Sequence, residues 1–177
     1  MNSFPQFKYH PNPLETGSIT ESDKECRSCN QKRGFIYAAS VYSSQDLDNS
    51  ICPWCIADGS AAAKLGASFV DDFNLFKTRI SEEIITEVAA RTPGYISWQP
   101  ECWETHCKDA CEFHGDLAKH EMKALSQEAV EFFRSELDLN ENEWIEFTRN
   151  YTPGGDPAIY KFVCRHCGKT IYNWDCS

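Results

Sequence analysis

Residues 26–55, CRSCNQKRGFIYAASVYSSQDLDNSICPWC, contain two Cys-x2-Cys pairs separated by 22 residues. This spacing lets one tight turn direct two thiolates at the same metal ion, and two such turns complete a tetrahedral zinc site. Between them, residues 34–42 have the aromatic and β-branched content of the strand that a zinc ribbon needs. We therefore predict a zinc-ribbon-like module over residues 1–70, with a structural zinc ion held by Cys26, Cys29, Cys52 and Cys55.

A third Cys-x2-Cys pair, Cys164 and Cys167, lies near the C-terminus and needs further ligands. The segment 103–114, WETHCKDACEFH, is the best source of them. We expect a helix around residues 98–111, which would place two cysteines four residues apart on one face. The sequence predicts a second structural zinc ion held by Cys107, Cys111, Cys164 and Cys167. Alternatives for the fourth ligand are Cys102, His106, His114 and His166.

The remaining pattern predicts a single α+β domain, in which a helical module over residues 71–177 ends in a zinc-knuckle β-hairpin. Apolar residues at helical spacing predict helices at 59–66, 80–91, 118–138 and 141–150. Ser81 and Asn140 are the expected N-caps of the second and fourth of these helices. The hairpin strands are predicted at 159–163 and 170–174.

The charge of the chain is −10, from 17 basic and 27 acidic residues, and most of it lies in one segment. Residues 101–146 hold 13 acidic and 4 basic residues, a net charge of −9. This balance argues against a general nucleic-acid binder, which must neutralise phosphates. No apolar run is long enough for a membrane segment, and the N-terminus lacks a signal pattern. We therefore expect a cytoplasmic protein, in a reducing compartment where cysteines bind metals more often than they form disulfides.

These features favour a zinc-stabilised, non-enzymatic binding protein that presents its acidic segment to a basic protein partner. One alternative is a zinc-dependent hydrolase at the second Cys/His cluster, with Glu104 or Glu112 as the base. That activity requires a zinc ion with an open position for water. A second alternative is a zinc-ribbon nucleic-acid-binding or regulatory factor, which would use the few basic residues around the first Cys pair.

Four longer stretches resemble the CbrC family of bacterial proteins. They are YHPNPLETGSI at 9–19, ICPWCIADGSAAAKLGASFVDDF at 51–73, RTPGYISWQPECWETHCKDACEFHGD at 91–116 and KFVCRHCGKTIYNWDCS at 161–177. The resemblance implies a bacterial, cytoplasmic protein related to one linked to tolerance of colicin E-type toxins, which carry DNase domains. A basic toxin domain would then be the partner of the acidic segment. The resemblance implies no enzymatic activity and no catalytic residues.

Overall fold

A computed structural model describes residues 3–177 of the chain. Its elements are, in chain order, β1 (Ile19–Glu21), β2 (Phe35–Tyr37), α1 (Pro53–Ala57), α2 (Ser60–Leu65), α3 (Phe73–Lys77), α4 (Glu82–Arg91), β3 (Thr105–His106), β4 (Asp109–Ala110), β5 (Glu112–Asp116), α5 (Lys119–Met122), α6 (Gln127–Glu136), α7 (Glu141–Asn150), β6 (Ala158–Val163) and β7 (Thr170–Asp175). The predicted α+β class is confirmed. Within the described residues, no helix has the length and apolarity needed to cross a bilayer.

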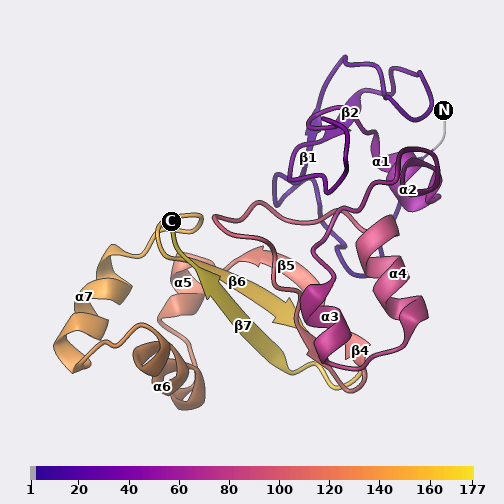
Figure 1. The fold of residues 1–177 in the computed structure, drawn as a ribbon. Coiled ribbons are helices and arrows are strands. Elements are labelled where there is room, and N and C mark those ends of the chain that lie inside the picture. The colour runs from indigo at the N-terminus through magenta and orange to yellow at the C-terminus, as the bar shows by residue number, and fades with distance from the viewer. Residues whose placement is uncertain (1–2) are drawn as a thin grey trace.

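An antiparallel sheet, in the order β5-β6-β7, organises the C-terminal part of the chain (Figure 1). Successive side chains of a strand point to opposite faces, so β6 can bury residues on both sides. Tyr160 and Phe162 belong to one core cluster, and Ile159 belongs to another, with Phe133 of α6 and Trp144 of α7. The three helices α5, α6 and α7 therefore cover one face of this sheet.

The other face of the sheet packs against a cluster of aromatic rings that surrounds Tyr95. The Tyr95 ring stacks on Phe113 at 4.4 Å, with an angle of 17° between the rings. Tyr160 lies 4.7 Å from it, and Trp103 and Phe162 each lie 5.9 Å away. Aromatic pairs at these distances contribute beyond the apolar area that they bury. This cluster fixes the connection between α4 and β3 against the sheet.

The N-terminal part of the chain has its own core, built around the short β1–β2 ladder, α1 and α2. Ile19 and Ile36 are buried there beside Cys26, Cys52 and Cys55. The predicted strand at 34–42 is shorter than expected, because only Phe35–Tyr37 pair with β1. The details of a zinc ribbon are not confirmed.

Two helices begin at the caps that the sequence predicts. Ser81 accepts a hydrogen bond from the amide of Ile84 at the start of α4. Asn140 accepts bonds from the amides of Asn142 and Glu143, and the Glu143 carboxylate accepts one from the Asn140 amide. This reciprocal pattern is a capping box, which satisfies amides that no helical carbonyl can reach. The predicted hairpin strands are also confirmed as β6 and β7.

Two predicted helices are wrong. The long helix at 118–138 is divided into α5 and α6, because Ser126 caps a new helix through the amide of Ala129. The helix around 98–111 is absent, and β3 and β4 form a hairpin there. The hairpin turns at Cys107 and Lys108, which adopt φ values of 52° and 60°. A right-handed helix cannot include such residues.

Residues 3–18 form an extended segment without helix or strand, which we call the lead-in, and it contacts both parts of the chain. Phe7 packs in the N-terminal core, and Tyr9 in the cluster beside the sheet. His10 is fully buried, with Nδ1 2.8 Å from the Pro93 carbonyl and Nε2 2.7 Å from the Thr16 hydroxyl. Burial lowers the pKa of His10 to about 4, so its ring is neutral at physiological pH. No local sequence pattern signals these partners.

Gly94 lies where the connection after α4 touches the N-terminal core. A β-carbon at this position would be 2.2 Å from the Phe69 carbonyl oxygen and 2.8 Å from the Tyr37 hydroxyl. The Tyr37 hydroxyl donates a hydrogen bond to the same Phe69 carbonyl, which limits how far these atoms can shift. Only glycine allows this approach of two backbones.

We expect Gly94→Ala to lower the free energy of unfolding by about 3 kcal/mol, because the added methyl overlaps a backbone oxygen in a packed core. Urea denaturation followed by tryptophan fluorescence measures this change.

Gly34→Ala is the control, since a β-carbon there has no neighbour within 4 Å, although φ is +84°. It should cost only about 1 kcal/mol of left-handed backbone strain. Equal costs for the two variants would show that overlap with the Phe69 carbonyl does not limit position 94.

Candidate metal centres

The first candidate centre brings together Cys26, Cys29, Cys52 and Cys55, whose sulfur atoms all lie within 4.8 Å of one another. None of the ten cysteines of the chain forms a disulfide. The Sγ atoms of Cys29 and Cys52 are 3.9 Å apart. Two thiolates bound tetrahedrally to zinc, with bonds of about 2.3 Å, would lie about 3.8 Å apart. The spacing therefore suits a shared metal ion and is far too long for the S–S bond of about 2 Å.

Backbone geometry explains how the first pair converges. The amide of Asn30 donates to the Cys26 carbonyl at 2.7 Å, and the Cys26 amide donates to the Gln31 carbonyl at 3.0 Å. Asn30 has a φ of 54°, which closes the turn. Cys52 instead precedes α1, which has Pro53 in its first turn. The Cys52 amide donates a hydrogen bond to the Cys26 sulfur at 3.2 Å. Hydrogen bonding from the Cys52 side chain and nearby amides lowers the pKa of Cys26, which favours the thiolate.

The second candidate centre consists of His106, Cys107, Cys164 and Cys167, whose ligand atoms also lie within 4.8 Å of one another. The Sγ atoms of Cys107 and Cys167 are 3.9 Å apart. The Nδ1 atom of His106 lies 3.2 Å from Cys107 Sγ and 3.4 Å from Cys167 Sγ. Zinc–nitrogen bonds of about 2.05 Å and zinc–sulfur bonds of about 2.3 Å give an expected separation of about 3.5 Å. This cluster also suits one tetrahedral ion.

The turn that carries Cys164 and Cys167 repeats the geometry of the Cys26 turn. The Gly168 amide donates to the Cys164 carbonyl at 2.9 Å, and the Cys164 amide donates to the Lys169 carbonyl at 2.8 Å. Gly168 takes the place of Asn30, with a φ of 72°. This turn joins β6 to β7, so the register of the hairpin sets the direction of both thiols.

The other half of the second centre comes from the two-residue turn between β3 and β4. Two central residues with positive φ define a type I′ turn, which usually contains Asn or Gly. Cys107 and Lys108 hold that conformation here without being glycine. Left-handed backbone costs about 1–2 kcal/mol per non-glycine residue, so other interactions must stabilise this turn.

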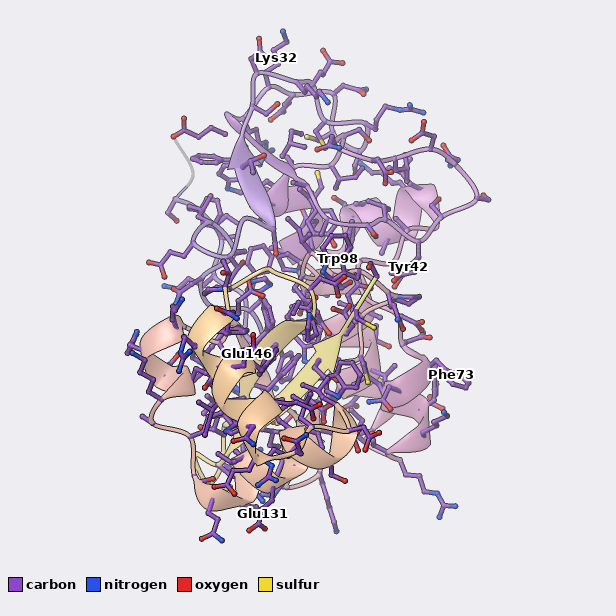
Figure 2. The ribbon with its side chains drawn as sticks, turned by 90° about the vertical axis from the view of Figure 1, so that its left-hand side faces the viewer. Lys32, Tyr42, Phe73, Trp98, Glu131 and Glu146 are labelled. Carbon is purple, nitrogen blue, oxygen red and sulfur yellow. The ribbon has the colours of Figure 1, made fainter. Side chains whose placement is uncertain are left out.

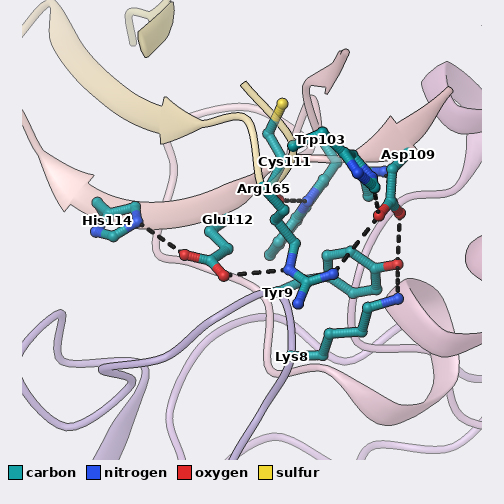
Figure 3. Close-up of polar contacts among 10 residues, drawn as sticks. Lys8, Tyr9, Trp103, Asp109, Cys111, Glu112, His114 and Arg165 are labelled. Carbon is teal, nitrogen blue, oxygen red and sulfur yellow. Dashed lines mark hydrogen bonds and ion pairs between the residues drawn. The ribbon is translucent and has the colours of Figure 1, made fainter. Parts of the chain in front are cut away.

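Asp109 supplies such interactions in the strand after the turn. Its side chain is 9% exposed, and its Oδ2 atom lies 2.9 Å from His166 Nε2 and 3.6 Å from Arg165 Nη1. The Tyr9 hydroxyl donates to Oδ1 at 2.6 Å, and Lys8 Nζ donates to the Tyr9 hydroxyl at 2.6 Å (Figure 3). Burial raises the pKa of Asp109, but these hydrogen bonds and the Lys8 charge outweigh it, so the pKa lies below its usual range.

The predicted ligand set of the second centre requires one correction. Cys111 lies outside the group of converging ligand atoms, fully buried in the aromatic core. Burial raises the pKa of the Cys111 thiol to about 12, which keeps it protonated. The predicted helix is the source of the error, because the β3–β4 turn directs Cys107 toward the Cys164 turn. His106, a candidate fourth ligand on sequence grounds, contributes the fourth converging ligand atom.

The three remaining candidates for the fourth ligand do not join this cluster. Cys102 is half-buried, and its carbonyl accepts a hydrogen bond from Asn173. His166 belongs to the Cys164 turn but contacts Asp109, and His114 lies 3.3 Å from Glu112.

Sequence reasoning missed the support that Tyr9 gives to the second centre. Tyr9 lies 100 residues from Asp109 in the chain, yet their side chains share a buried hydrogen bond. No local pattern signals such a contact.

The two centres differ in their exposure to solvent. Three of the four cysteines of the first are buried, whereas Cys107 and Cys167 of the second are exposed. Near the second centre, the Glu112 carboxylate is held between Arg165 at 3.1 Å and His114 at 3.3 Å. A base engaged in this way is poorly placed to activate water.

Comparison with known proteins gives a match over nearly the whole chain. The model of a family described as "Uncharacterised protein family (UPF0167)" matches residues 4–176. A UPF0167 protein of Pseudomonas aeruginosa is 46% identical over 172 residues, which cover 97% of this chain and 96% of the relative. UPF0167 proteins of Mycobacterium bovis and Mycobacterium tuberculosis are each 39% identical over 167 residues, 93% of this chain and 89% of the relative. No solved structure matches the chain.

These matches correct the resemblance to the CbrC family. The family whose model matches is UPF0167, and no match supports an assignment to CbrC. The link to colicin tolerance depended on that resemblance and loses its basis.

Replacing His106 and Cys111 separately distinguishes the two ligand sets. We expect His106→Ala to lower the bound zinc by about one ion per chain, because three remaining ligands leave the tetrahedral set incomplete. Cys111→Ala should retain the metal and lower stability by about 1–2 kcal/mol through a small cavity. Elemental analysis of the purified variants gives the zinc content. If Cys111→Ala loses zinc while His106→Ala retains it, Cys111 and not His106 is the fourth ligand, as expected from the sequence.

Proposed function

This chain belongs to the UPF0167 family, whose description names no activity, and we propose from its own side chains that it is a non-enzymatic binding protein stabilised by two structural zinc ions. One observation carries the proposal. Each cluster offers four protein ligand atoms within 4.8 Å, at spacings that suit tetrahedral zinc. A zinc ion with four protein ligands has no open position for water or substrate, which is typical of structural sites.

The location of each cluster supports a structural role. The first cluster lies inside the N-terminal core, where strands of only three residues give little independent stability. The second cluster joins the β3–β4 turn to the β6–β7 turn, two segments separated by about 60 residues. A hydrolase would require an open coordination position, which a set of four Cys/His ligands does not offer. Of the two candidate bases, Glu112 is paired with Arg165 and His114. Cysteines without disulfides at both centres suit a reducing compartment.

Zinc removal tests this proposal. We expect a strong chelator to unfold the N-terminal part cooperatively, because the binding energy of a structural zinc ion, about 10–16 kcal/mol, is part of the folding energy. Cys52→Ser should lower the zinc content by about one ion and unfold the same part. Zinc analysis and circular dichroism melting measure both effects.

Cys176→Ser is the matched control, since Cys176 belongs to neither cluster. It should keep both zinc ions and the melting temperature of the original protein. A Cys52→Ser protein with unchanged zinc content and melting would refute the first site.

The partner surface is the second part of the proposal, and we assign it to the acidic face of α6, α7 and their connection (Figure 2, where Glu131 and Glu146 are labelled). Seven acidic residues of this face are exposed: Glu128, Glu131, Glu136, Asp138, Glu141, Glu143 and Glu146. Arg134 is the one basic residue between positions 126 and 146. Phe132 and Ile145 are also 41% and 49% exposed there. Acidic charge around exposed apolar side chains fits a basic protein partner.

A small, strongly basic protein such as lysozyme serves as the probe for this surface. We expect calorimetry at low ionic strength to detect binding that weakens as salt shortens the Debye length from about 30 Å to about 8 Å. The triple variant Glu131→Gln, Glu136→Gln, Glu141→Gln should bind more weakly. The control triple Glu15→Gln, Glu21→Gln, Asp23→Asn removes equal charge from the N-terminal part. Equal weakening by both would mean that net charge, not this face, drives the association.

A further inference from the structure

A cavity of about 390 Å³ lies between the lead-in, the connection after α4, the sheet and the loop before β6. We call it the Trp98 cavity, and its walls include Thr16, Tyr95, Trp98, Gly115, Asp116 and Tyr160. Small-molecule sites are commonly cavities of about 300–1,000 Å³ with apolar walls and a few polar groups. This cavity lies away from both metal centres, since none of their ligands lines it. In Figure 2, Trp98 lies where the N-terminal part meets the sheet.

The walls are rigid and largely aromatic. Tyr95, Phe113 and Tyr160 are each at most 3% exposed and pack against one another. Trp98 is different, with 54% of its surface exposed. Its indole Nε1 donates to the Gly155 carbonyl at 3.0 Å, and its amide donates to Asp175 at 2.9 Å. The ring is therefore fixed in place although it remains open to a ligand.

Gly115 allows β5 and the lead-in to approach each other closely at one wall of the cavity. Gly115 has a φ of +90°, and a β-carbon there would lie 3.2 Å from the Thr16 methyl group. The Thr16 hydroxyl is in turn held by buried His10. These contacts set the distance between the lead-in and β5, and thus the width of the cavity.

The charge of the cavity is negative. Asp116 is its one wall carboxylate, and the walls contain no lysine, arginine or histidine. Asp116 forms no ion pair within the described residues. The nearby Asp175 carboxylate is already satisfied by the Tyr160 hydroxyl at 2.8 Å and by the Trp98 amide. Asp116 is therefore a carboxylate beside aromatic rings without a cation of its own.

We propose that the Trp98 cavity binds a small organic ammonium ion, with Asp116 as its counter-ion and the exposed Trp98 ring against its alkyl groups. Aromatic rings attract cations through their faces, and tryptophan does so most strongly. A bare divalent metal fits poorly, because calcium and magnesium need six or more oxygen ligands and the walls are mostly apolar. A neutral apolar ligand would offer the Asp116 carboxylate no opposite charge. This inference goes beyond the proposed function and does not depend on the zinc ions.

Titration with choline chloride, followed by amide NMR of the zinc-loaded protein, tests the proposal. We expect saturable shifts at Ser97, Gly115 and Gly154, which border the cavity. The neutral isostere 3,3-dimethylbutan-1-ol has the same shape without the charge and should bind about tenfold more weakly. Sodium chloride at equal concentration should leave these amides unshifted.

Asp116→Asn should weaken choline binding by about tenfold, whereas the exposed control Asp23→Asn should leave it unchanged. Trp98→Leu should also weaken it, and melting curves will show that both cavity variants remain folded. Equal affinity for choline and its isostere would overturn the proposal in favour of an apolar site. Absence of saturable shifts, or shifts that spread away from the cavity, would also overturn it.

Discussion

The buried carboxylate of Asp109 is the constraint on which the C-terminal part of the structure depends. An isolated charge in a protein interior is strongly unfavourable, so its partners must be in place when the chain folds. Those partners come from two distant segments: Tyr9 in the lead-in, and His166 with Arg165 in the β6–β7 turn. By satisfying this one carboxylate, the chain holds the lead-in across the sheet and brings the two turns of the second metal centre together.

The two metal centres have different structural consequences. The first lies within the N-terminal core, beside strands of only three residues, so a bound metal and this core would unfold as one cooperative unit. The second lies at the edge of a sheet that is already packed on both faces. Loss of its metal would release the strained turn at Cys107 and Lys108, while the sheet keeps its aromatic core. In the proposed zinc-bound protein, one centre would be required for folding and the other would fix local geometry at the surface.

The aromatic core connects the surface centre to the Trp98 cavity. Phe113 and Tyr160 line the cavity, and Phe113 lies 6.1 Å from Trp103. The indole of Trp103 donates to the Cys111 carbonyl at 3.0 Å, two residues beyond Asp109. Close-packed interiors transmit strain, so the shape of the cavity depends on the packing that Asp109 and the second centre maintain.

The sequence by itself determined the features that depend on near neighbours. Cys-x2-Cys spacing predicted the three converging pairs, and Ser81 and Asn140 predicted helix starts, because turns and caps are formed within a few residues. Only the tertiary structure decided the fourth position of the second cluster. Residues 98–111 have no decisive local pattern, and the pairing of β3 with β4 makes His106, rather than Cys111, face the Cys164 turn. The Asp109 contacts and the Trp98 cavity were equally beyond prediction, because segments up to 100 residues apart form them and local propensity does not report such distances.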